Sequence, residues 1–240
     1  MKHTLFISDL HLSVEHPELI AALTKLGETL VSNASALYIL GDFFALWAGD
    51  DDKSEFNTEV IAILKKIAQK IPVYLMPGNR DFLLGKKFVA TSGCTLLPDP
   101  TKIYLHGRPT LLSHGDMLCT NDLVAVIFRH VSQNKLGKKI FLRLPLKFRA
   151  KLAMAIHKHS THKKKNKTGS MMDVNQKKIE QVMKKYGVSQ LIHGHTHKPN
   201  HYTFMLQDQT MRRIVLPDWE TMPQVVVYYE NGTWETQRLN

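Results

Sequence analysis

Five short apolar segments of the sequence each end in an aspartate, a histidine or an asparagine. In chain order they are HTLFISDLH, ALYILGDFF, VYLMPGNRD, TLLSHGD and QLIHGHTH. A short apolar run bounded by polar residues predicts a buried strand, and the helical spacing of apolar residues in 17–31 and about 55–70 predicts helices between them. In α/β sheets, the loops that follow strand carboxyl ends converge on one crevice, where ligands bind. The sequence therefore predicts an α/β fold with one site built from five strand ends.

The composition favours a chain that works in a reducing compartment. Its 240 residues are 43% hydrophobic, which is enough for one substantial core. The apolar runs are too short for a transmembrane helix, and the N-terminal run is predicted to be a buried strand and not a signal peptide. Cys94 and Cys119 form no disulfide framework and match no zinc-ligand spacing. We expect a cytoplasmic protein.

The positive charge of the chain is concentrated in one segment. Residues 123–172 contain thirteen Lys or Arg and no Asp or Glu, whereas the other 190 residues hold 19 basic and 21 acidic side chains. Such a block favours an anionic surface or ligand, although a solvated face is the alternative. The segment also interrupts the strand–helix pattern. We therefore predict a core of residues 1–122 and 173–240, β-rich at its C-terminal end, with a basic helical insertion at 123–172.

Three histidines, His193, His195 and His197, alternate in the last of the five segments. Side chains at every second position of an extended segment point to the same side. Neutral imidazoles are good ligands for a divalent metal. A polar turn would give the same letters, so this stretch alone leaves both interpretations open.

The order of the five strand ends resembles that of the calcineurin-like metallophosphoesterases. This resemblance implies a four-layer αββα sandwich with an inserted helical cap. It also implies two metal ions, with Mn²⁺ favoured and Fe or Zn not excluded by the ligand types. The first ion would be held by Asp9, His11 and His197 and the second by Asn79, His114 and His195, with Asp42 between them. His193 has no metal role in the family pattern, and we expect it to be a packing residue or a partner of a ligand.

The proposed ligand types suit the hydrolysis of a phosphate ester or anhydride. Two divalent cations activate a water molecule and compensate the charge that develops on phosphorus. The carboxylates of Asp9 and Asp42 neutralise half of the charge of two such cations, and neutral histidine and asparagine ligands leave the other half for hydroxide and substrate. More carboxylates would cancel the field that catalysis needs.

Several longer phrases narrow the resemblance. YILGDFFALWAGDDD, PGNRDFLLGKKF, HGDMLCTND and MMDVNQ are similar to the UDP-2,3-diacylglucosamine diphosphatase family of lipid A biosynthesis in Gram-negative bacteria. This similarity implies hydrolysis of UDP-2,3-diacylglucosamine to UMP and 2,3-diacylglucosamine 1-phosphate (lipid X), at the cytoplasmic face of the inner membrane. The residues implied in catalysis are Asn79, Arg80, His114 and His195. Those implied in substrate binding are Asn79, Arg80, Asp122, Ser160, Lys164, Lys167 and His195.

Three positions depart from family patterns. Many calcineurin-like enzymes have histidine after the asparagine of the third segment, where this chain has Arg80. Arginine is never deprotonated in proteins and so cannot act as a general acid. A departing phosphate, with a second pKa near ~6, needs charge neutralisation and not a proton, so Arg80 favours a pyrophosphate bond as the target. Ala45 stands where an acidic residue is common, and His157 where an arginine is common.

Two other classes of function remain open at this point. The first is a metal-dependent phosphodiesterase that acts on cyclic nucleotides or nucleic acid, with the basic insertion as a phosphate-binding patch. The insertion has only three aromatic residues, Phe128, Phe141 and Phe148, and single-strand binders use aromatic stacking platforms. The second is a metal-stabilised binding module at the membrane surface. We expect contact with inner-membrane lipid, and neither nucleic acid nor an obligate protein partner.

Overall fold

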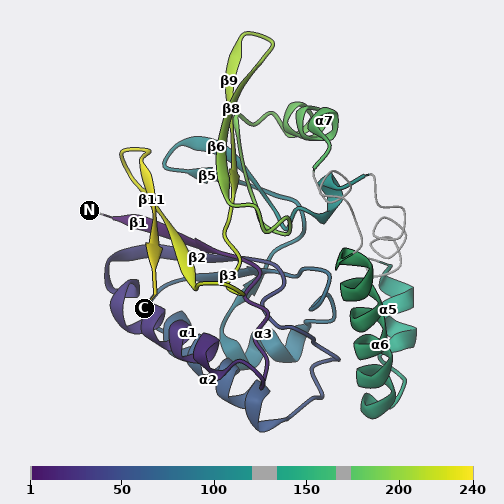
Figure 1. Ribbon diagram of the computed structural model, residues 1–240. Coiled ribbons are helices and arrows are strands. Elements are labelled where there is room, and N and C mark those ends of the chain that lie inside the picture. Colours follow the sequence, from purple (N-terminus) through teal and green to yellow (C-terminus); the bar gives the residue numbers. More distant parts are fainter. Residues whose placement is uncertain (1, 121–133, 166–173, 240) are drawn as a thin grey trace.

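The computed structural model describes residues 2–120, 134–165 and 174–239, without the side chains of Lys135 and residues 156–165. These ranges form two β-sheets flanked by helices (Figure 1). The first sheet has the strand order β11-β10-β1-β2-β3-β4. Its strands are β1 (His3–Ile7), β2 (Ala34–Leu40), β3 (Val73–Met76), β4 (Thr95–Leu96), β10 (Gln224–Tyr229) and β11 (Trp234–Arg238).

The second sheet has the strand order β5-β6-β7-β9-β8. Its three central strands are parallel to one another, and the two edge strands pair with them antiparallel. The strands are β5 (Thr101–Leu105), β6 (Arg108–Ser113), β7 (Gln190–His193), β8 (Asn200–Leu206) and β9 (Gln209–Val215). The five predicted strands correspond to β1, β2 and β3 in the first sheet and to β6 and β7 in the second.

Apolar side chains fill three layers between these elements. Helices α1 (Pro17–Thr29), α2 (Glu55–Ala68) and α3 (Lys86–Ser92) cover the outer face of the first sheet, and α7 (Gln176–Tyr186) covers the second (Figure 1). Residues such as Phe6 and Ile192 pack between the sheets, where burial of apolar surface stabilises the fold. The predicted αββα sandwich is confirmed by this order of helix, sheet, sheet and helix.

Local sequence explains where the predicted helices begin and end. Pro17 occupies the first turn of α1, where its missing N–H costs nothing, and Leu19, Leu23 and Leu26 form its buried face. Helix α1 ends before the 3₁₀ turn η1 (Val31–Asn33), so the prediction of a helix to residue 31 was slightly too long. Helix α2 begins after Ser54, whose hydroxyl accepts a hydrogen bond from the Asn57 N–H at 3.4 Å.

Two helices, α5 (Lys135–Phe141) and α6 (Leu146–Lys165), lie in the described part of the basic segment and stand beside the first sheet and its helices (Figure 1). Arg149 of α6 is buried, and its guanidinium donates to the Ala48 carbonyl, to the Leu144 carbonyl and to the Asp51 carboxylate. This ion pair holds the pKa of Asp51 below its ordinary value. Arg149 therefore fastens α6 to the loop that follows β2. The division of the chain into core and insertion stays a prediction.

We expect Arg149→Ala to lower the free energy of unfolding by about 2–4 kcal/mol, because it removes a buried guanidinium that donates to two backbone carbonyls and to Asp51. Urea unfolding followed by circular dichroism measures the change. Arg143→Ala is the matched control, since Arg143 is an exposed arginine of the same segment. Equal unfolding curves for the two variants would contradict the anchoring role of Arg149.

Candidate metal centre

The loops after β1, β2, β3, β6 and β7 meet at one end of the two sheets and bring the predicted polar residues together. The Asp9 N–H donates to the Gly41 carbonyl at 3.0 Å, which joins the first two loops. The His195 N–H donates to Asp9 Oδ2 at 2.8 Å, which joins the loops of the two sheets. The site therefore lies where both sheets end, as the strand-end pattern predicts.

The backbone at this end of the sheets is strained. Asp9, His11, Asp42, His195 and His197 all have φ between 50° and 70°, the left-handed region that side chains other than glycine rarely adopt. Such conformations cost on the order of 1 kcal/mol or more each and cluster at functional sites. The strain is consistent with selection of these loops for the placement of side chains.

The polar side chains form two adjoining groups. Asp9, His11 and His197 make the first group and Asp42, His114 and His195 the second, and within each group the candidate ligand atoms lie within 4.8 Å of one another. The Asp42 carboxylate faces both, because its Oδ2 lies 3.4 Å from His11 Nε2 and its Oδ1 3.8 Å from His114 Nε2. Asn79 joins the second group, with its Oδ1 3.0 Å from His114 Nε2.

The hydrogen bonds of the histidines turn their lone pairs toward the centre. A carbonyl can only accept, so the 3.0 Å contact between His114 Nδ1 and the Leu40 carbonyl places a proton on Nδ1. In the neutral ring, Nε2 then presents a lone pair toward Asn79 Oδ1. These two acceptor atoms need a positive charge between them, which a proton on Nε2 supplies in the metal-free protein and a cation would supply in its place. These donor atoms fit a divalent cation.

The electrostatics of the centre also indicate a need for positive charge. Burial by itself lowers the pKa of His114, but the carboxylates of Asp42 and Asp9 outweigh it and raise the pKa to about 9. Burial raises the pKa of Asp42, yet His114 and His11 hold it well below its ordinary value. Asp9 Oδ1 is buried and has no hydrogen-bond partner in the described ranges. Bound cations would satisfy both carboxylates.

Comparison with known proteins agrees with this geometry. The family model of the calcineurin-like phosphoesterases matches residues 2–199. The chain is 40% identical over 237 residues to a UDP-2,3-diacylglucosamine hydrolase of Coxiella burnetii (strain Dugway 5J108-111), covering 99% of this chain and 98% of the relative. It is 43% identical over 229 residues to one of Pseudomonas aeruginosa (strain UCBPP-PA14), covering 95% of each. The chain belongs to the UDP-2,3-diacylglucosamine hydrolases, within the calcineurin-like phosphoesterases.

A solved structure supports the fold alone. A novel archaeal phosphodiesterase matches with a TM-score of 0.51 at 12% identity, covering 98% of this chain and 99% of that chain. As a calcineurin-like phosphoesterase the chain binds divalent metal, and the two groups of donor atoms are its candidate ligands.

Arg80 lies beside the two groups. Its backbone N–H donates to Asp42 Oδ1 at 2.9 Å, and its Nε lies 3.4 Å from Asp42 Oδ2. His193 is fully buried, its Nδ1 lies 2.9 Å from the Gly194 carbonyl oxygen, and burial lowers its pKa to about 4. The structure thus separates His193, which belongs to neither group, from His195 and His197.

The other predicted substrate contacts cannot be placed around the centre. Asp122 and Lys167 lie outside the described residues. Ser160, Lys164 and His157 fall in α6, but their side chains are outside the described part of the chain. The Ala45 N–H donates to the Leu12 carbonyl at 3.0 Å, between the first two loops.

Asp81 is a buried residue whose role sequence reasoning missed. Its Oδ1 accepts from the Gly78 N–H at 2.7 Å and its Oδ2 from the Phe43 N–H at 2.8 Å. Burial and the charge of Asp42 raise the pKa of Asp81 to about 6. It ties the loop of Asp42 to that of Asn79. Gly78 lets these loops approach, because a Cβ there would lie 2.3 Å from Asp42 Oδ1.

Asp218 and Glu220 also lie at the centre, where they form a third group of potential ligand atoms with His197, although neither is among the predicted residues. Glu220 Oε1 is 2.8 Å from His11 Nδ1, and Asp218 Oδ2 is 3.7 Å from His197 Nδ1. The only signal in the sequence is a pair of acids around one tryptophan in PDWE, which has no metal-ligand spacing of its own.

Proposed function

We propose that this protein hydrolyses the diphosphate bond of UDP-2,3-diacylglucosamine to give UMP and 2,3-diacylglucosamine 1-phosphate (lipid X). The observation that carries this proposal is the near full-length similarity to hydrolases named for this substrate, in a chain whose two donor groups share Asp42. A two-cation centre suits attack of water on phosphorus with departure of a phosphate group.

Seven residues would hold the cations. Asp9, His11 and His197 would bind one and Asn79, His114 and His195 the other, with the Asp42 carboxylate between them. We propose two Mn²⁺ ions, since oxygen and nitrogen ligands of this mixture suit Mn as well as Fe or Zn. When bound, such cations lower the pKa of a coordinated water molecule and neutralise phosphoryl oxygens.

Arg80 would bind the diphosphate and offset the charge of the departing phosphate. Its guanidinium is permanently charged, and its Nε lies 3.4 Å from Asp42 Oδ2. Since it cannot give up a proton, it acts by charge alone. Together with Asn79 and His195 it forms the part of the proposed substrate site that the structure describes. Asp122, Ser160, Lys164 and Lys167 stay proposed contacts to the rest of the substrate.

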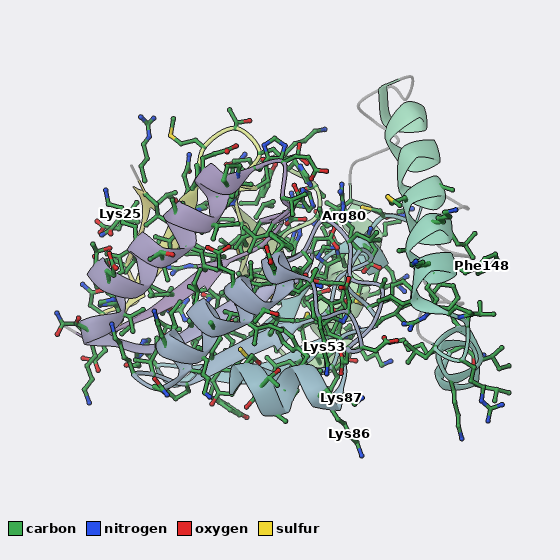
Figure 2. The ribbon with its side chains drawn as sticks, turned by 90° about the horizontal axis from the view of Figure 1, so that it is seen from below. Lys25, Lys53, Arg80, Lys86, Lys87 and Phe148 are labelled. Carbon is green, nitrogen blue, oxygen red and sulfur yellow. The ribbon has the colours of Figure 1, made fainter. Side chains whose placement is uncertain are left out.

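Helices α5 and α6 would carry the protein to the cytoplasmic face of the inner membrane. Leu136, Ile140 and Phe148 are 66%, 57% and 54% exposed, and Figure 2 shows Phe148 on the side of α6 that points away from the body of the protein. Exposed lysines such as Lys139 and Lys147 accompany them. Apolar side chains mixed with cations are typical of segments that bind anionic bilayers. None of the helices in the described ranges combines the length and apolar composition needed to span a membrane.

Phosphorus NMR of UDP-2,3-diacylglucosamine with purified protein and Mn²⁺ tests the activity, with UMP and lipid X as the expected products.

Arg80→Lys should keep part of the rate because the charge remains, and Arg80→Ala should lower it by about 100-fold or more, as for loss of one charge-stabilising group. Arg80→His should not exceed Arg80→Lys, because no proton is needed. A substrate that stays intact would contradict the proposed function, and an unchanged rate in Arg80→Ala would contradict the role of Arg80.

Co-sedimentation with vesicles of anionic lipid tests the membrane contact. Replacing Leu136, Ile140 and Phe148 together by Ser should reduce binding several-fold, because it removes the apolar surface that would enter the interface. Tyr104→Ser with Met205→Ser is the control, since these residues are similarly exposed on the second sheet. Equal binding of both variants and wild type would contradict the membrane contact.

A further inference from the structure

The tripeptide Asp218–Trp219–Glu220 lies against the first donor group. It belongs to the connection between β9 and β10. The indole of Trp219 is fully buried in the core beneath the helices, and its Nε1–H donates to the Gln224 carbonyl at 2.8 Å. The Trp219 N–H donates to the Asp9 carbonyl at 3.1 Å. A buried side chain and a backbone hydrogen bond thus fix the tripeptide to a candidate ligand.

The two acids of this tripeptide face the outer nitrogens of two candidate ligands. Glu220 Oε1 lies 2.8 Å from His11 Nδ1, and Asp218 Oδ2 lies 3.7 Å from His197 Nδ1. The inner nitrogens of the same rings face the centre: His11 Nε2 is 3.4 Å from Asp42 Oδ2, and His197 Nε2 is 3.6 Å from Asp9 Oδ1. The Glu220 backbone N–H donates to Asp218 Oδ1 at 3.0 Å, which holds the Asp218 carboxylate against the backbone of the tripeptide.

This arrangement has a direct consequence for metal binding. A carboxylate at Nδ1 holds the proton there, so the neutral ring presents its Nε2 lone pair inward and cannot rotate freely. Partners of this kind raise the basicity of a ligating histidine, and their loss typically lowers metal affinity by about 10–100-fold. The effect requires no contact between the carboxylate and the metal.

The histidines of the second group have different hydrogen-bond partners. His114 Nδ1 bonds to the backbone carbonyl of Leu40, and His195 Nδ1 lies 3.2 Å from His114 Nε2. No contact of either ring with Asp218 or Glu220 occurs among the described residues. Both carboxylates of the tripeptide therefore contact histidines of the first group.

We propose that Asp218 and Glu220 are positioning residues that set the affinity of the Asp9–His11–His197 site for its metal ion, independently of the other site. The inference rests on the proposed two-metal centre and adds that its two sites can be weakened separately. Glu220 contributes more than Asp218, because its contact is a hydrogen bond and that of Asp218 is a longer ionic contact.

Titration of the metal-free protein with Mn²⁺, with free Mn²⁺ measured by electron paramagnetic resonance, tests this inference. Wild-type protein should bind two ions. Glu220→Ala should lower the affinity for one ion by about 10–100-fold and leave the affinity for the other unchanged. Asp218→Ala should lower the affinity for the same ion by a smaller factor. Glu220→Gln should recover most of the affinity, because its amide oxygen still accepts from His11 Nδ1. Glu230→Ala, which replaces an exposed glutamate in the turn after β10, is the control.

The outcomes separate this inference from the proposed function. The inference would be overturned if Glu220→Ala lowered the affinity for both ions equally or for neither. It would also be overturned if Glu220→Gln lost as much affinity as Glu220→Ala. A wild-type protein that binds fewer than two ions would overturn the two-metal centre and the inference with it. If the protein binds two ions and Glu220→Ala loses affinity for one of them, but UDP-2,3-diacylglucosamine is not hydrolysed, the inference stands and the proposed substrate is overturned. Saturating Mn²⁺ should restore the rate of Glu220→Ala, since the carboxylate only orients a ligand.

Discussion

The Asp42 carboxylate is the point on which the arrangement of the site depends. It is buried at the end of β2, and its two oxygens face histidines of different groups. A buried carboxylate is costly unless charged or hydrogen-bonded partners surround it. Here the Arg80 N–H, the Arg80 guanidinium and the histidines supply these partners. Two cations would complete this environment, and the neutral ligands around them would leave excess positive charge for an anionic substrate.

The two sheets together place this carboxylate between the two groups. The first sheet supplies Asp9, Asp42 and Asn79 from the ends of β1, β2 and β3, and the second supplies histidines from the ends of β6 and β7. Asp81 and Gly78 let the β2 and β3 loops approach, and Asp9 Oδ2 joins the two sheets through the His195 N–H. The strained φ values of five candidate ligands reflect the precision that this meeting requires.

The sequence allows much of this to be predicted because strand ends and helix periodicity are local signals. The αββα sandwich was predicted through the resemblance and is confirmed by the packing of the two sheets. Helix α1 was predicted to within two residues. The structure brings the candidate ligands together in adjoining groups, and their metal roles stay proposals. Ser160 and Lys164 lie in α6 with side chains outside the described part, so the structure does not bear on their contacts.

Other features depend on contacts between distant segments, which no local pattern reveals. Glu220 meets His11 across 209 positions, and Arg149 meets the Ala48 carbonyl across 101. No pattern in the sequence around Asp81 indicates that its carboxylate links two loops. For the same reason, the sequence shows that the segment is basic but not which of its arginines anchors it. Within its described part, Arg149 is the one arginine that is buried against the core.

Anomalous diffraction from a crystal of the Mn²⁺-loaded protein tests the central claim most directly. The account predicts two peaks, one beside Asp9, His11 and His197 and one beside Asn79, His114 and His195, with the Asp42 carboxylate between them. A single peak, or two peaks of which only one contacts Asp42, would contradict it.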